Sequence, residues 1–87
     1  MAAPLKVSVV SADQQVWAGE ATMVVARTTE GEIGILAGHE PMLAILASGE
    51  VRVTLADGSK VVAEAADGFL SVENDTVTIV ARQAGLV

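Results

Sequence analysis

Short runs in which valine or another apolar residue recurs at every second position constrain the fold of this chain more than any other feature. In residues 5–11, for example, Leu5, Val7 and Val9 fall on one face of an extended segment. Alternating runs rich in β-branched residues and bounded by turn residues are typical of strands. We count about eight or nine such runs, and no segment reads as a convincing helix. The sequence therefore predicts an all-β fold, a flattened β-sandwich or barrel of short strands.

The segment 51–65 is expected to form a hairpin around Asp57-Gly58, a dipeptide that favours tight turns. A strict two-residue turn would place Lys60 and Glu64 on the apolar face of the first strand, because a shift of one residue exchanges the faces of a strand. We therefore expect a longer loop, with Leu55 opposite Val61 and Val53 opposite Ala63.

A second hairpin is expected over residues 69–81, with residues 73–75 as its turn. The alternation in its second strand places Val77 and Ile79 inward and the neighbouring threonines outward. Residues 83–87 carry little signal.

Residues 28–41 differ from the rest, because glycines recur there at a density typical of tight turns or of close backbone approach. Residues 42–47 are apolar throughout. Periodicity does not decide between a buried strand and a single helical turn for so short a segment.

Composition narrows the classes of function. The 87 residues suffice for one domain, expected over residues 1–87. There are no cysteines, which excludes disulfides and thiolate metal sites. The net charge of −6 and the scattered basic residues argue against nucleic acid as a partner. No uncharged stretch approaches the length of about 20 residues that a membrane span needs, and no signal peptide is visible, so we expect no direct membrane insertion.

Residues suited to chemistry are few. No nucleophile motif surrounds any serine, so we expect the single histidine, His39, to be a turn residue bonded to nearby backbone. The polar cluster of Glu30, Glu32, His39 and Glu40 matches no known metal-ligand spacing. The sequence therefore predicts no catalytic residues, no metal ligands and no cofactor.

Two residues permit alternative interpretations. Lys60 lies near the first hairpin turn, and lipoyl or biotinyl carrier domains present a modified lysine at such a turn. Its neighbours do not match those that a modifying ligase reads. A small acidic carrier domain, or another protein-binding module, therefore remains only the alternative hypothesis. Trp17 would suit either a partner contact or packing against an aromatic-poor core, and we expect packing.

Three motifs occur in order along the chain. The central one, residues 29–43, has an acidic Gly-Glu-Ile-Gly run followed by Gly-His-Glu-Pro-Met-Leu. Residues 10–19 precede it, and the run Asp-Gly-Phe-Leu-Ser-Val follows it at 67–72. Together they closely resemble the epsilon subunits of F-type ATP synthases. Ala37 departs from that signature, which commonly has proline before Gly-His.

The resemblance implies an N-terminal β-sandwich of about ten strands. In that family the domain lies at the foot of the central stalk, binds the gamma subunit and rests on the c-ring. It helps to couple proton translocation to ATP synthesis and catalyses nothing itself. We therefore expect a peripheral location on the cytoplasmic face of a bacterial plasma membrane. Family members usually continue into a C-terminal helical hairpin, so we expect the sequence to be a piece of a longer protein.

The resemblance also implies two sets of contact residues. Those expected at the c-ring are Glu30, Gly31, Glu32 and Ile33. Those expected at the gamma subunit are Ser11, His39, Pro41 and Met42.

Overall fold

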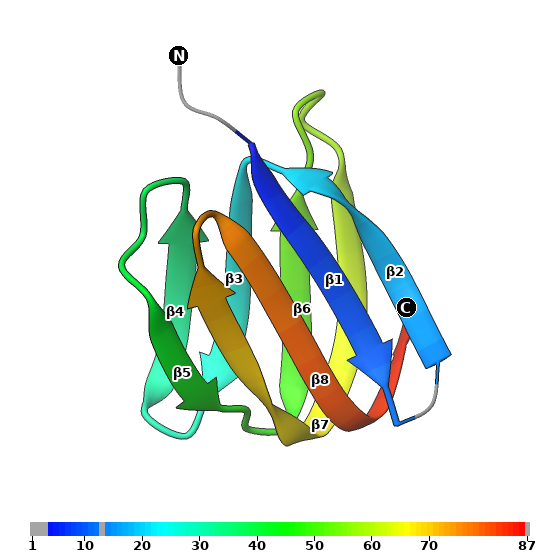
Figure 1. The fold of residues 1–87 in the computed structure, drawn as a ribbon. Helices are drawn as coiled ribbons and strands as arrows, with labels where there is room; N and C mark the ends of the chain where they lie inside the picture. Colours follow the sequence, from blue (N-terminus) through cyan, green and yellow to red (C-terminus); the bar gives the residue numbers. More distant parts are fainter. Residues whose placement is uncertain (1–3, 13, 87) are drawn as a thin grey trace.

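A computed structural model of the chain describes residues 4–12 and 14–86, which form strands and no helix (Figure 1). Consequently, no helix in these two ranges has the length and hydropathy to span a bilayer. The described strands are β1 (Leu5–Ser11), β2 (Gln14–Ala21), β3 (Met23–Thr28), β4 (Gly31–Leu36), β5 (Met42–Ile45), β6 (Gly49–Thr54), β7 (Lys60–Glu73) and β8 (Thr76–Leu86).

Hydrogen bonds join the strands in the order β2-β1-β8-β7-β6-β3-β4, and β5 pairs with β7 beside that path. The first half of β7 pairs with β6, and its second half pairs with β5. The first half of β8 pairs in parallel with β1. Figure 1 shows the resulting two layers, with β1, β5 and the adjoining halves of β7 and β8 in front of β3, β4 and β6.

The prediction of an all-β sandwich is confirmed. The segments 60–65 and 69–72, which the sequence suggests as separate strands, form the single 14-residue strand β7. β8 likewise continues for 11 residues, through the C-terminal segment that carries little signal. Since β7 and β8 each contribute a segment to both layers, the eight strands supply about ten segments, as the family resemblance implies.

β7 changes layer at Asp67 and Gly68. Asp67 has a φ of 59°, a left-handed conformation that aspartate adopts more readily than most residues. Gly68 approaches β8 so closely that an added Cβ would collide with the Val80 carbonyl oxygen. The pairing of β7 with β8 nevertheless has the same register on both sides of Asp67. The two strands therefore bend together, as one ribbon.

The bend at Asp67 also shifts the alternation of side chains by one position. Before it, Ala63 and Ala65 are buried, whereas after it the buried residues are Leu70 and Val72. A straight strand would bury positions of one parity only. The shift therefore allows one continuous strand to direct apolar side chains into the same core from both layers.

The core is aliphatic, as the low aromatic content requires. Trp17 is partly buried, packs against this core and lies over the backbone of Gly19, which supports packing as its role. The largest fully buried side chains are Leu5, Ile35, Leu70, Ile79, Val9, Val24, Val51, Val53, Val72 and Val77.

The hairpin over 51–65 has the expected apolar face but a different pairing, with Val53 opposite Val61. The predicted partner of Val53, Ala63, instead lies opposite Val51, so the prediction was wrong by two positions. Both pairings leave five residues in the loop, but the observed loop, 55–59, begins one residue earlier than the predicted loop, 56–60. The Ser59 hydroxyl and amide both donate to the Asp57 carboxylate, at 2.6 and 2.9 Å, which lowers the pKa of Asp57.

The hairpin over 69–81 is confirmed. Its turn residues Asn74 and Asp75 have φ values of 50° and 58°, as tight two-residue hairpin turns require. Val77 and Ile79 are fully buried, as predicted.

The glycine-rich segment 28–41 was predicted to contain tight turns or close backbone approaches, and its central part forms the strand β4. A glycine with positive φ lies at each end of this strand: Gly31, its first residue, at 118°, and Gly38, two residues after its last, at 86°. For the apolar segment that follows, the structure selects the strand over the helical turn. That strand, β5, is only half buried, because its alternate residues Leu43 and Ile45 face outward.

The bend generates a testable prediction. Replacing Gly68 with alanine would place a Cβ against the Val80 carbonyl and 2.5 Å from the Ala81 Cα, so backbone must move. We expect the free energy of unfolding to fall by about 1–3 kcal/mol in urea denaturation. Gly85→Ala is the matched control, because its Cβ would meet nothing within 4 Å. Equal stability of the two variants would contradict this account of the bend.

Candidate docking surfaces

The turn between β3 and β4 presents the predicted c-ring residues. The buried Thr28 holds it, because its Oγ1 donates to the Gly31 carbonyl at 2.8 Å and accepts from the Glu30 amide at 3.2 Å. The side chains of Glu30 and Glu32 are exposed, whereas Ile33 is partly buried against the core. A rigid turn thus carries two carboxylates into solvent.

The β3–β4 turn is bonded to β5 in the other layer. The Thr29 amide donates to the Ile45 carbonyl, and the Ala47 amide donates to the Arg27 carbonyl, both at 3.0 Å. A groove of about 310 Å³ lies between this turn and β5. It is lined by residues 28–30, Ile33 and residues 42–45.

The loop 37–41 between β4 and β5 carries two of the predicted gamma contacts, His39 and Pro41. The His39 amide donates to the Leu36 carbonyl at 3.2 Å, and its Nδ1 lies 2.8 Å from the Glu40 carbonyl oxygen. Since a carbonyl only accepts, Nδ1 carries the hydrogen. The expected turn histidine, bonded to nearby backbone, is therefore confirmed.

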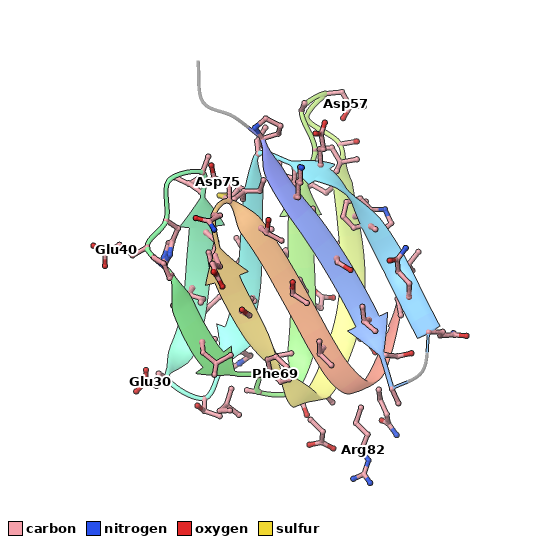
Figure 2. All side chains as sticks on the ribbon, viewed as in Figure 1. Glu30, Glu40, Asp57, Phe69, Asp75 and Arg82 are labelled. Atoms are coloured by element: carbon pink, nitrogen blue, oxygen red, sulfur yellow. The ribbon has the colours of Figure 1, made fainter. Side chains whose placement is uncertain are left out.

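The predicted residues do not form one site. The acidic turn precedes β4 and the His39 loop follows it, and Figure 2 shows Glu30 at the foot of this strand and Glu40 further along the same side. Ser11 ends β1 and lies far from the His39 loop (Figure 1). Met42 is the exception among the predicted gamma contacts, because it lines the groove together with Glu30 and Ile33.

Leu43, Ile45 and Phe69 form an apolar patch that was not predicted from the sequence. These side chains are 69%, 58% and 39% exposed. Ile45 on β5 and Phe69 on β7 are direct cross-strand partners (Phe69 is labelled in Figure 2). Leu43 lies two residues before Ile45, on the same face of β5. One feature of the sequence could have revealed this patch. A half-buried strand normally alternates apolar and polar residues, whereas residues 42–47 have no polar residue on either face.

The described residues also place the other candidates that the sequence suggests. Within 4–12 and 14–86, no three carboxylate or histidine side chains converge as metal ligands would. A second groove, of about 340 Å³, lies between residues 48–50, 64–66 and 83–85, and it contains no histidine or lysine. Lys60 is the first residue of β7 and pairs with Thr54, which places it beside the hairpin loop and not at its tip. A carrier domain would present its lysine at the tip.

Known proteins resemble the chain over nearly its whole length. A family model described as the beta-sandwich domain of the ATP synthase delta/epsilon chain matches residues 4–86. The ATP synthase epsilon chain of Streptomyces avermitilis is 50% identical over 86 residues, which are 99% of this chain and 69% of that protein. The ATP synthase epsilon chain of Micrococcus luteus is 52% identical over 84 residues, 97% of this chain and 92% of the relative.

Solved structures share the fold. A chain in a cryo-EM structure of the Euglena gracilis mitochondrial ATP synthase, with OSCP, F1 and c-ring, superposes with a TM-score of 0.91 at 28% identity. The match covers 99% of this chain but 55% of the Euglena chain, so the protein spans about half the length of that neighbour. A chain of the Tetrahymena thermophila central stalk and c-ring superposes with a TM-score of 0.75 at 14% identity, over 95% of this chain and 66% of that one, and shows the fold alone.

The Thr28 hydroxyl generates a prediction about the acidic turn. We expect Thr28→Val to lower the free energy of unfolding by about 1–2 kcal/mol, because two hydrogen bonds of a buried hydroxyl are lost. Amide exchange at Glu30 should accelerate in the same variant. Thr28→Ser retains the hydroxyl and serves as the control. Unchanged Glu30 exchange in the valine variant would show that the turn is held by other contacts.

Proposed function

The chain belongs to the ATP synthase delta/epsilon chain family of β-sandwich domains, and from this we propose that it is a non-catalytic rotor component of an F-type ATP synthase. It docks onto the gamma subunit and the c-ring and helps to couple proton translocation to ATP synthesis. Its residues 1–87 act as one docking domain. The proposed location is peripheral, on the cytoplasmic face of a bacterial plasma membrane.

The apolar patch is the observation that carries the proposal of a gamma interface. Leu43 and Ile45 are more than half exposed, and an aromatic side chain, Phe69, lies beside them. Exposed apolar residues grouped around an aromatic are typical of protein interfaces, where a few such side chains supply most of the binding energy. The patch follows directly on the loop with His39 and Pro41, which the family resemblance assigns to the gamma subunit.

The acidic turn supports the proposal of a c-ring interface. Glu30 and Glu32 project from backbone that Thr28 and β5 hold in place. In this family the c-ring loops carry arginine and other polar groups. We propose that Glu32 pairs with such a group, with Glu30 nearby.

Hydrogen bonds provide a route by which force would pass between the two surfaces. A load on Glu30 or Glu32 acts on the β3–β4 turn, whose Thr29 amide is bonded to the Ile45 carbonyl. Ile45 pairs in turn with Phe69 on β7, a strand that is also bonded to β8. Because protein interiors are close-packed and of low compressibility, such a path transmits force with little deformation. This stiffness suits a rotor component.

The gamma interface is tested by a charge within the apolar patch. We expect Ile45→Asp to weaken binding of the purified gamma subunit at least about tenfold, in titration and in co-elution from a sizing column, because a buried unpaired carboxylate opposes docking. Leu86→Asp is the matched control, since Leu86 is similarly exposed, at 54%, but ends β8 away from the patch. If both variants bind gamma as the parent does, the interface lies elsewhere.

The c-ring interface is tested by charge reversal at Glu32. If docking removes this carboxylate from water, Glu32→Lys should weaken assembly with the c-ring by about 2–5 kcal/mol and reduce ATP-driven proton pumping. A pair that stays exposed would contribute only about 0–1 kcal/mol and would be sensitive to salt. Glu20→Lys, an equal charge change at an exposed position of β2, is the control. Intact assembly and coupling in the Glu32 variant would exclude the buried pair.

A further inference from the structure

Asp75 connects three parts of the fold. It lies in the β7–β8 turn, where its φ of 58° is in the left-handed region. Its Oδ1 accepts a hydrogen bond of 2.7 Å from the amide of Gly38, 37 residues away in the β4–β5 loop. Its own carbonyl accepts from the Lys6 amide, at 2.8 Å, at the start of β1. Figure 2 shows Asp75 beside the loop that carries Glu40.

The loop 37–41 has few other ties. Its remaining hydrogen bonds among the described residues come from the His39 amide, to Leu36, and from the His39 ring, to Glu40. These partners are three residues and one residue away in sequence. Such bonds shape the loop but do not fix it relative to the sandwich. In the described part of the chain, the Asp75 carboxylate is the hydrogen-bonding group that joins this loop to another hairpin.

The position of Asp75 sets two requirements on its residue type. The turn needs a residue that adopts a positive φ, which glycine, asparagine and aspartate do readily. The Gly38 amide needs a side-chain acceptor at the length of Oδ1, which glycine lacks. Only aspartate and asparagine meet both requirements, and a carboxylate gives the stronger bond.

We infer that Asp75 is a positioning residue, which fixes the 37–41 loop on the sandwich and thereby presents His39 and Pro41 for docking to the gamma subunit. The inference rests on the proposed function. The Lys6 bond anchors the backbone of Asp75 to β1, so the carboxylate extends from a fixed point. A loop already held in one arrangement loses less conformational freedom when a partner binds.

Two substitutions separate the side chain from the backbone conformation. Asp75→Gly retains the positive φ and removes the acceptor, whereas Asp75→Asn retains both. We expect the Gly38 amide of the isolated chain to exchange about tenfold faster in the glycine variant, because a hydrogen bond to a charged group is lost. Exchange in the asparagine variant should stay close to that of the parent. Gamma binding should weaken about three- to tenfold in the glycine variant and recover in the asparagine variant.

The outcomes distinguish this inference from the proposed function. Unchanged Gly38 exchange in Asp75→Gly would overturn the tether itself. Faster exchange with unchanged gamma binding would overturn the role of the tether in docking, while leaving the proposed function intact. If the parent chain itself does not bind gamma, the proposed function fails and the docking role of Asp75 fails with it, whereas the Gly38 exchange still decides the tether.

Discussion

The close approach of β7 to β8 at Gly68 is the contact on which the rest of this fold depends. A sheet of eight twisted strands cannot bury one apolar face unless it curls over or splits into two layers. Here the ribbon formed by β8 and the central strand β7 makes that turn without losing register. Because Gly68 has no Cβ, the backbones are able to come so close, and the positive φ at Asp67 accompanies the move of the inward face to the next position. Both features belong to two adjacent residues.

The same bend creates the surfaces that are proposed to bind partners. Beyond it, β7 pairs with β5 and no longer with β6, so β5 lies in the opposite layer from its sequence neighbour β4. The two strands form an open side of the sandwich, where β4 and β5 each have a neighbour on one edge only. The acidic turn, the groove and the apolar patch all lie along this side. Partner contact would cover backbone groups that an isolated sheet edge leaves unpaired.

The sequence predicted local features well and long-range ones poorly. In β1 and in the 69–81 hairpin, the alternation of apolar residues identified both the strands and their buried faces. The two-residue period of the sequence coincides there with the alternation of buried and exposed side chains. The register at Val53 was missed because the loop begins at Leu55 and not one residue later. The bonds between the Asp57 and Ser59 side chains stabilise this loop, and the dipeptide Asp57-Gly58 does not reveal where it begins. The continuity of β7 was missed since an Asp-Gly pair normally ends a strand, and here it bends one.

The candidate contact residues show the same limit. Motif order located the acidic turn and the His39 loop, but a motif does not say that β4 separates them or that Asp75 ties one of them to a distant hairpin. The apolar patch was not predicted because Leu43 and Ile45 belong to a run that is apolar on both faces. Composition alone does not distinguish a strand buried in the core from a strand that exposes one apolar face to solvent. Only the pairing of Ile45 with Phe69 identifies the outer face.

The two proposed interfaces differ in the free energy they are able to supply. Exposed carboxylates such as Glu30 gain little from pairing in water, about 0–1 kcal/mol each, and salt weakens them further. Burying the outer faces of Leu43, Ile45 and Phe69 stabilises a complex at about 25 cal/mol per Å² of apolar surface, and salt does not screen it. Anchoring of the domain is therefore expected from the apolar patch, and orientation toward the c-ring from the acidic turn.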